Sequence, residues 1–421
     1  LHIEAHSFPT RRSSDLSMLG AIVGDIIGSA YEFNNTKRKE FHLFTPRSKF
    51  TDDTVMTLAV ARWLCDDKEH CKETLVRYMQ EFGRRYPTAG YAGSFMRWLY
   101  NPEPQPYNSY GNGSAMRVSP VAFYSHSLQE ALGLAKISAE VTHNHSEGIK
   151  GAQAIASSIY LARHGATKRE IKSYVEEQFH YDLSQQLDDI RPTYSYDMSC
   201  QHTVPQALLA FLEGANFEEV IRSAVSIGGD SDTIAAMAGG IAQAFYVIPK
   251  KLSSYCYALL TPELRGVLND FEDLLGCREA DPFNIERFIE AQNTSNTYRQ
   301  ALVEMQQGHK QTHWIWFIFP QLKGFGHSAY SQYYGLADTD EARTYLAHPL
   351  LNERLRTITK AVLLHSNMDV KRVMGSSIDA VKLKSSMTLF DVVCPNDIFE
   401  EVLKTFYGGE RDSLTLNKIG L

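Results

Sequence analysis

Residues 228–245 read GGDSDTIAAMAGGIAQAF, an acidic cluster that runs directly into small and apolar residues. The apolar side chains from Ile234 to Phe245 recur at the i, i+3, i+4, i+7 spacing of a helix that faces a core. Pro249 follows, and proline cannot continue a helix because it lacks the backbone N–H. The stretch therefore predicts a buried helix with carboxylates at its N-terminus.

A glycine-bearing stretch near the start of the chain favours the same fold class. Gly20, Gly24 and Gly28 recur every four residues among apolar side chains, so one face of the predicted helix is bare backbone and packs closely on a neighbour. Alternating strand patterns are scarce up to residue 275, and we expect an all-α domain with a less periodic excursion at 180–203. The residues expected to form a substrate-facing loop there are Tyr194, Tyr196 and His202.

Two clusters of hydroxyl and carboxylate side chains precede predicted helices. They are Thr51-Asp52-Asp53-Thr54 and Asp230-Ser231-Asp232-Thr233. Helix capping, worth about 1 kcal/mol, is the alternative explanation for each cluster. A cap needs only one oxygen, however, and adjacent carboxylates repel each other unless a cation or the helix dipole offsets the charge. Because such oxygen donors suit hard divalent cations such as magnesium, the two clusters indicate a candidate two-metal hydrolase.

Other acidic motifs do not fit these residues. An EF-hand beginning at Asp230 requires glycine and glutamate at its sixth and twelfth positions, where this chain has Ala235 and Ile241. A haloacid-type phosphatase places its Asp-x-Asp nucleophile after an early strand, whereas Asp230 and Asp232 come late and open a helix. Calcium sensing and aspartyl-phosphate chemistry are therefore not expected.

The composition is that of an ordinary globular protein. Hydrophobic residues make up 43% and charged residues 22%, and the formal net charge of -7 provides no general attraction to nucleic acid. Six cysteines lack the C-x-x-C spacing of zinc sites, and no apolar stretch approaches the roughly 20 residues of a membrane span. We expect a cytoplasmic protein without membrane association.

The chain divides by composition. Residues 1–17 lack periodicity and resemble a translated sequencing adapter, so we expect a disordered, non-native scar there and a natural start at Met18. The remaining residues, about 400, are too many for one ordinary core. The expected parts are a first domain at 18–275, a linker at 276–282, and a smaller, mostly helical domain at 283–421 whose first helix opens at Phe283.

Six ordered blocks resemble the ADP-ribosylglycohydrolase family, which includes dinitrogenase reductase-activating glycohydrolases and ADP-ribosyl-acceptor hydrolases of animals. The blocks are Gly24-Asp25-Ile26-Ile27-Gly28, Glu32, residues 51–54, residues 111–117 (GNGSAMR), Thr142-His143-Asn144-His145 and residues 228–233. The resemblance spans about 18–275 and implies orthogonally packed helices, two Mg2+ ions for which Mn2+ can substitute, and release of ADP-ribose from a modified acceptor.

Carried over to this chain, the resemblance implies a metal and catalytic set. The implied metal ligands are Thr51, Asp52, Asp53, Asp230, Asp232 and Thr233. It implies that Glu32 lies beside the metals, although alone Glu32 would be interpreted as a solvated residue. Cleavage at the anomeric carbon builds positive charge on the ribose while water attacks, and paired metals orient the hydroxyls and activate the water. The general base is Asp53, Asp232 or Glu32, and the sequence does not choose among them.

The resemblance also implies a substrate-binding set. It consists of Gly111, Asn112, Gly113, Ser114, Met116 and His143. Glycines before a helix let backbone N–H groups approach phosphate oxygens, although a Gly-Asn-Gly segment by itself is more often a plain turn. Tyr107 or Tyr110 is available to stack on adenine. His143 is assigned to substrate and not to metal.

The second domain resembles a small, mostly helical bacterial family without an established activity. The blocks that carry this resemblance are residues 313–321 (HWIWFIFPQ), 346–350 (LAHPL), 382–388 (KLKSSMT) and 408–409 (GG). A helical core filled with aromatic side chains explains them. The alternative is a pocket that binds a phosphate or nucleotide through His313, Gln321, Lys384 and Ser386.

Two functions from different classes follow from these patterns. The first is a magnesium-dependent hydrolase that releases ADP-ribose from a protein side chain, a small molecule or a nucleobase, although the charge does not indicate a nucleic-acid partner. The second is a catalytically silent ADP-ribose-binding reader. The intact acidic set favours the enzyme, because a reader does not need six oxygen-donor positions.

Overall fold

The computed structural model of the protein describes residues 18–277 and 281–421. The N-terminal stretch expected to be a scar, and part of the expected linker, lie outside these residues. The chain separates into two compact units at residues 280 and 281. No strand forms in the described residues, which confirms the all-α prediction, and no described helix is long and apolar enough to span a membrane.

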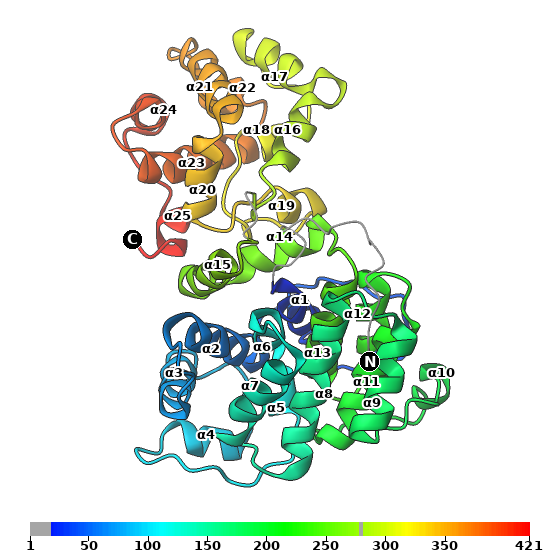
Figure 1. The fold of residues 1–421 in the computed structure, drawn as a ribbon. Helices are drawn as coiled ribbons and strands as arrows, with labels where there is room; N and C mark the ends of the chain where they lie inside the picture. Colours follow the sequence, from blue (N-terminus) through cyan, green and yellow to red (C-terminus); the bar gives the residue numbers. More distant parts are fainter. Residues whose placement is uncertain (1–17, 278–280) are drawn as a thin grey trace. The chain divides into compact units, whose positions relative to one another are not determined.

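The described residues of the first unit form fifteen helices, whose arrangement is drawn in Figure 1. They are α1 (Leu19–Gly28), α2 (Asp52–Asp66), α3 (Lys72–Arg85), α4 (Gly93–Leu99), α5 (Gly113–Met116), α6 (Ser119–Tyr124), α7 (Leu128–Glu140), α8 (Ser146–Arg163), α9 (Lys168–Phe179), α10 (Leu187–Ile190), α11 (Cys200–Glu213), α12 (Phe217–Ile227), α13 (Ser231–Phe245), α14 (Lys250–Leu259) and α15 (Pro262–Leu275).

Helix α13 is the centre of the first unit. Every residue from Ser231 to Ala244 is buried, and the helix packs against α1, α8, α11 and α12 (Figure 1). The predicted bare face of α1 contacts α13, since a Cβ added at Gly24 would lie 2.0 Å from the carbonyl oxygen of Ala235. A Cβ at Gly28 would lie 2.4 Å from the Cα atom of Asp232. The two backbones therefore touch where α13 carries its acidic residues.

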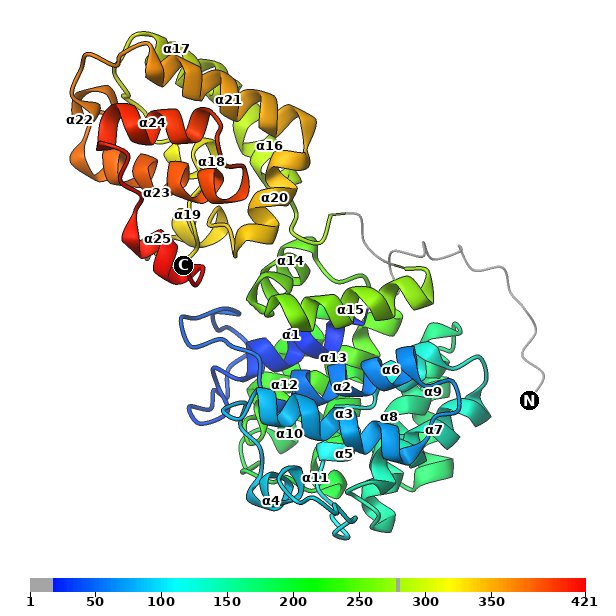
Figure 2. The same ribbon diagram turned by 90° about the vertical axis from the view of Figure 1, so that its left-hand side faces the viewer.

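The second unit has its own helices and core (Figure 2). Its helices are α16 (Glu286–Asn293), α17 (Thr297–Gln306), α18 (Ile315–Ile318), α19 (Ala329–Tyr333), α20 (Thr339–Ala347), α21 (Pro349–Leu363), α22 (Val370–Val373), α23 (Ser377–Val393), α24 (Ile398–Tyr407) and α25 (Ser413–Lys418), with a 3-10 turn at Thr294–Asn296. Helix α23 lies beside α24 and also contacts α20, α22 and α25.

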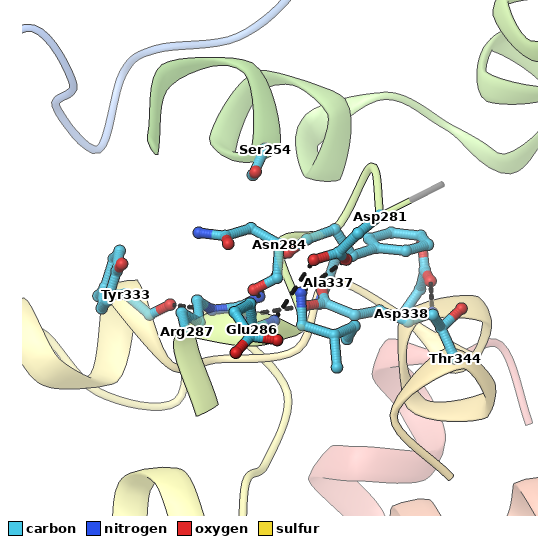
Figure 3. Close-up of polar contacts among 12 residues, drawn as sticks. Ser254, Asp281, Asn284, Glu286, Arg287, Tyr333, Ala337, Asp338 and Thr344 are labelled. Atoms are coloured by element: carbon cyan, nitrogen blue, oxygen red, sulfur yellow. Dashed lines mark hydrogen bonds and ion pairs between the residues drawn. The ribbon is translucent and has the colours of Figure 1, made fainter. Parts of the chain in front are cut away.

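The first helix of the second unit begins at Glu286, so its predicted start at Phe283 is wrong. Asp281 accepts a hydrogen bond of 2.7 Å from the backbone N–H of Ile285, and the turn that this bond closes precedes the helix (Figure 3). Arg287 then donates to the carbonyl oxygen of Tyr333 at 2.9 Å and pairs with the buried carboxylate of Glu341 at 2.6 Å. Polar contacts of this buried arginine thus join α16 to α19 and α20.

The four residues of the alternative pocket in the second unit have different surroundings. His313 is exposed and Gln321 is buried. Lys384 pairs with Glu410 at 3.4 Å, while Ser386 is fully buried with no hydrogen-bond partner among the described residues. The phosphate or nucleotide pocket therefore stays a prediction, and the aromatic block mainly fills the core through Trp314, Phe317 and Phe319.

Candidate metal centre and substrate site

Asp25, in the middle of α1, organises the start of α2. Its Oδ2 atom accepts hydrogen bonds from the backbone N–H groups of Thr51 at 2.9 Å and Thr54 at 3.1 Å, and from the Thr54 hydroxyl. Its Oδ1 atom accepts the hydroxyl of Thr51 at 2.7 Å. No role for Asp25 was predicted from the sequence. In the sequence Asp25 stands out only as an acid among glycine and isoleucine residues of an otherwise apolar predicted helix. Its hydrogen-bond partners are more than 25 positions away, so the local pattern did not reveal them.

The two acidic clusters meet at Asp53. Thr233 Oγ1 of α13 donates to Asp53 Oδ2 of α2 at 3.1 Å, across 180 positions of sequence. The other oxygen of this carboxylate, Asp53 Oδ1, is buried and has no hydrogen-bond partner among the described residues. Asp53 is only 2% exposed, so water does not replace the missing partner at the surface. Such a buried acceptor indicates a group that only a ligand can satisfy.

Two groups of carboxylates share Asp232. In the first, oxygen atoms of Asp25, Asp53 and Asp232 lie within 4.8 Å of one another, and in the second the same holds for Glu32, Asp230 and Asp232. Both groups belong to the described residues, and each has the oxygen-only chemistry of a hard-cation site. A shared carboxylate places the two groups side by side.

Asp230 faces the substrate loop instead of capping α13. It is the N-cap residue of that helix, but its side chain makes no capping bond and accepts a hydrogen bond from Asn112 Nδ2 at 2.7 Å. The preceding Gly228 and Gly229 have φ values of +77° and +68°, a conformation that favours glycine. A side chain at Gly229 would also collide with Tyr194, 2.7 Å away. The glycine pair therefore forms the turn in which Asp230 stands at the N-cap position while its side chain bonds to Asn112.

Asp52 stands apart from both carboxylate groups. It is half-buried, and a Cβ added at Gly90 would lie 3.3 Å from its Oδ1 atom. Burial and the charges of Asp25, Asp230 and Glu32 raise the pKa of Asp52 to about 8. The Asp52 carboxyl is therefore close enough to both carboxylate groups to be repelled by their charges. Thr51, by contrast, caps α2 by accepting a bond from the Asp53 N–H, as the capping alternative predicted, and also contacts the cluster through Asp25.

Glu32 follows α1 and lies at the edge of the cluster. Its Oε1 atom accepts a hydrogen bond of 3.3 Å from the Tyr196 hydroxyl, so the predicted loop tyrosine does reach the site. Burial, followed by the charge of Asp230, raises the pKa of Glu32 to about 7. Tyr196 is half-exposed, and Phe33, which follows Glu32 in the sequence, is 87% exposed. His202, the third predicted loop residue, lies in the first turn of α11.

No cationic side chain of the described residues balances these acids. Within residues 18–277 and 281–421, no Lys, Arg or His side chain pairs with Asp25, Glu32, Asp53, Asp230 or Asp232. Burial raises the pKa of every one of these carboxyls, and for Asp53 and Asp232 neighbouring carboxylates raise it further. Buried like charges demand either protons or cations. The donor set and the unpartnered oxygen of Asp53 therefore fit divalent cations bound through oxygen.

The predicted phosphate loop lies against this centre through Asn112. Gly111 and Gly113 are partly exposed, and the backbone N–H of Asn112 donates to the carbonyl oxygen of Met198 at 2.7 Å. Ser114 is fully buried and donates its hydroxyl to the carbonyl oxygen of Gly148 at 2.7 Å, and Met116 is 7% exposed. The two glycines are thus the accessible part of the loop, whereas Ser114 anchors it.

His143 lies beside the same loop. A Cβ added at Gly113 would lie 3.0 Å from His143 Nε2, and one at Gly111 would lie 3.5 Å away. Tyr107 packs its ring at 5.9 Å from the histidine ring, while the half-exposed Tyr110 packs against His145. The loop, His143 and the two tyrosines therefore lie together and are joined to Asp230 through Asn112, and their part in substrate binding stays a prediction.

Comparisons with known proteins agree with this geometry. Residues 16–279 match the family model described as ADP-ribosylglycohydrolase, and residues 282–419 match that of a protein of unknown function (DUF1810). Mouse ADP-ribosylhydrolase ARH3 is 28% identical over 306 residues, covering 54% of this chain and 82% of its own. ADP-ribosylarginine hydrolase Tri1 of Pseudomonas putida is 26% identical over 260 residues, covering 55% and 69%.

Two solved structures are also similar. An ADP-ribosylglycohydrolase-related protein complex is 24% identical with a TM-score of 0.47 and covers 62% of this chain and 98% of its own. The conserved hypothetical protein Rv1873 of Mycobacterium tuberculosis is 38% identical with a TM-score of 0.32 and covers 34% and 99%. The family match extends over more than half of the chain and includes both acidic clusters. The chain belongs to the ADP-ribosylglycohydrolase family.

Proposed function

We propose that the first unit is a magnesium-dependent hydrolase that cleaves the glycosidic bond between ADP-ribose and a modified acceptor and releases ADP-ribose in the cytoplasm. The single observation that carries this proposal is the pair of carboxylate groups that share Asp232 without a cationic partner among the described residues. A reader that only binds ADP-ribose has no need for five converging, mutually repelling acids.

The proposed ligands for two Mg2+ or Mn2+ ions are Thr51, Asp52, Asp53, Asp230, Asp232 and Thr233. Asp25 is excluded from that set because both of its oxygens already accept hydrogen bonds from Thr51 and Thr54. When bound, such ions orient ribose hydroxyls and make water a better nucleophile at neutral pH. The cluster's negative charge also stabilises the positive charge that develops on the ribose.

The protein's own groups would divide the remaining work. Gly111 and Gly113 let the substrate's diphosphate approach the backbone, and Asn112 joins this loop to Asp230 of the metal centre. A carboxylate, Glu32, Asp53 or Asp232, would take the proton of the attacking water. Glu32 suits that role because its pKa is raised to about 7, which matches a base that works near neutral pH.

The acceptor is the open part of the proposal. Relatives are named for hydrolysis of ADP-ribosyl groups in general and of ADP-ribosylarginine in particular. Tyr196, which is half-exposed and bonds to Glu32, is the side chain that a leaving group would contact. An ADP-ribosylated protein or small molecule fits an acidic protein of this kind better than a nucleic acid does.

Incubation with ADP-ribosylated arginine, serine and DNA, with magnesium or EDTA, tests the proposal by mass-spectrometric detection of released ADP-ribose. We expect release from at least one substrate, its loss with EDTA, and its loss in Asp53→Asn. Asp189→Asn, which changes an exposed carboxylate of α10, serves as the control and should retain release. Tight ADP-ribose binding without release from any substrate would instead establish the reader.

A further inference from the structure

Arg117 is a buried cation without a carboxylate partner. It is fully buried, its Nε atom has no hydrogen-bond partner, and no acidic side chain of the described residues pairs with it. Burial lowers its pKa to about 10, which still leaves the guanidinium charged at neutral pH. An unpaired charge in a core is costly to fold, so its position requires an explanation.

The guanidinium of Arg117 donates a hydrogen bond to Thr142. Arg117 Nη2 donates to Thr142 Oγ1 at 2.9 Å and to the carbonyl oxygen of Ser138 at 2.7 Å. Arginine can only donate, so the Thr142 oxygen is the acceptor. The hydroxyl hydrogen of Thr142 must then be given to another atom.

That atom is His143 Nδ1, which lies 2.7 Å from Thr142 Oγ1. Thr142 is fully buried, and its hydroxyl has no other acceptor among the described residues. If Nδ1 carried a proton, the threonine oxygen would accept two bonds and its own buried hydrogen would be left without a partner, which is unfavourable. Nδ1 is therefore the acceptor, and the proton of the neutral ring resides on Nε2.

The protonated nitrogen faces the glycine loop. Nε2 is the ring atom that a Cβ at Gly113 would approach to 3.0 Å and a Cβ at Gly111 to 3.5 Å. No hydrogen bond from Nε2 to any residue in the described part of the chain is present. Burial, and then the charge of Arg117, lowers the pKa of His143 well below its usual value, which keeps the ring from taking a second proton.

We propose that Arg117 and Thr142 are positioning residues that fix His143 as a neutral, Nε2-protonated donor aimed at the anionic diphosphate of the ligand in the Gly111–Gly113 loop. This inference rests on the proposed function for the identity of the ligand. The chain of donors runs in one direction, from guanidinium to hydroxyl to imidazole, so each bond polarises the next. The buried positive charge thereby strengthens an N–H donor without itself reaching the loop.

The direct test is the tautomer of His143, read from nitrogen-15 ring signals of histidine-labelled full-length protein without ligand. His143→Asn identifies the signals by their loss. We expect a neutral ring protonated on Nε2 at pH 7. A ring protonated on Nδ1, or a doubly protonated ring, would overturn the proposal. This measurement needs no ligand, so it tests the Arg117–Thr142–His143 series of hydrogen bonds, here called the relay, even if ADP-ribose fails to bind. A failure to bind ADP-ribose would count against the proposed function instead.

The energetic test compares Thr142→Val with Thr142→Ser in titrations with ADP-ribose. Valine keeps the shape of threonine but removes the hydroxyl, so we expect mixed His143 tautomers and a dissociation constant raised about tenfold. Thr142→Ser keeps the hydroxyl, so it should retain the single His143 tautomer and the wild-type dissociation constant. Thr359→Val, a fully buried threonine in α21 that bonds the carbonyl oxygen of Leu355, controls for loss of a buried hydroxyl and should change neither. Thr142→Val with the wild-type tautomer and affinity would contradict the relay.

Discussion

Asp25 shows how a single buried residue prepares the site without occupying it. It accepts hydrogen bonds from Thr51 and Thr54 on both oxygens, and Thr51 and Asp53 belong to the proposed ligand set. The carboxylate therefore fixes the first turn of α2 relative to α1. Side chains far apart in the sequence thus hold α1 and α2 together beside the acidic end of α13.

We predict that Asp25→Asn weakens metal binding while leaving every proposed ligand in place. An amide has one acceptor oxygen and turns an NH2 group toward the threonine donors, so the turn that carries Asp53 loses its support. We expect the Mn2+ affinity, measured by calorimetry, to fall about 10- to 100-fold, as for other residues that orient ligands. Asp391→Asn, which removes a fully buried carboxylate from the second unit, should leave that affinity unchanged. Equal affinities of Asp25→Asn and the wild type would show that Asp25 does not orient the site.

At the residue scale, the sequence predicted part of the site. Carboxylates of both acidic clusters and Glu32 lie close together in the structure. This could be predicted because each cluster has more acidic residues than helix capping requires, and that excess is visible in the local sequence. Asp52 lies outside both carboxylate groups. The hydroxyl of Ser114 donates a hydrogen bond to the carbonyl oxygen of Gly148. Neither fact was visible in the local sequence pattern. Such outcomes depend on contacts between distant residues, which spacing along the chain does not reveal.

At the scale of elements, the contact between α1 and α13 positions the centre. The glycine spacing in α1 predicted a closely packed face, and the structure confirms it, with Gly20, Gly24 and Gly28 against the backbone of α13. The periodicity of residues 234–245 likewise predicted a buried helix, which α13 is. The start of α16 was predicted three residues too early, because the Asp281 turn depends on side-chain hydrogen bonds that composition does not specify.

We predict that Gly24→Ala destabilises the protein and disturbs the metal centre together. The new Cβ would lie 2.0 Å from the carbonyl oxygen of Ala235, so α1 must move away from α13. We expect the free energy of unfolding to fall by about 1–3 kcal/mol or more, measured by urea denaturation. Gly133→Ala in α7 is the matched control, since its Cβ would meet nothing within 4 Å, and it should stabilise by about 0.5–1 kcal/mol. A Gly24→Ala protein as stable as the wild type would contradict the close contact.

At the scale of the whole molecule, the chain contains two compact units, and the carboxylate groups described here all belong to the first. We predict that magnesium raises the unfolding temperature of one calorimetric transition only, because a ligand stabilises only the unit that binds it. Asp53→Asn should abolish that shift and leave the other transition unchanged. A shift of both transitions by the same amount would show that the units unfold as one or that both bind the ion.

The pH dependence of stability should report the unbalanced acids. The pKa values of Glu32 and Asp52 are raised to about 7 and 8 in the folded, metal-free chain, so folding favours their protonated forms. This contribution is fully present below the ordinary pKa values of 4.5 for Glu32 and 3.8 for Asp52, and it is lost as the pH rises to the folded-state values. We predict that the stability of the EDTA-treated protein falls as the pH rises from about 4 to about 8, and that the magnesium-induced shift grows over the same range. Asp52→Asn should flatten the slope, and an unchanged slope would exclude Asp52 from it.

The central claim is that two cations are held by side-chain oxygens on both sides of Asp232. Anomalous diffraction from crystals grown with Mn2+ and ADP-ribose tests it most directly, because the anomalous signal distinguishes manganese from water. We predict two manganese peaks, each in contact with Asp232, with one also contacting Asp53 and the other Asp230. Crystals that bind ADP-ribose beside the Gly111–Gly113 loop but show no manganese at Asp232 would contradict the claim.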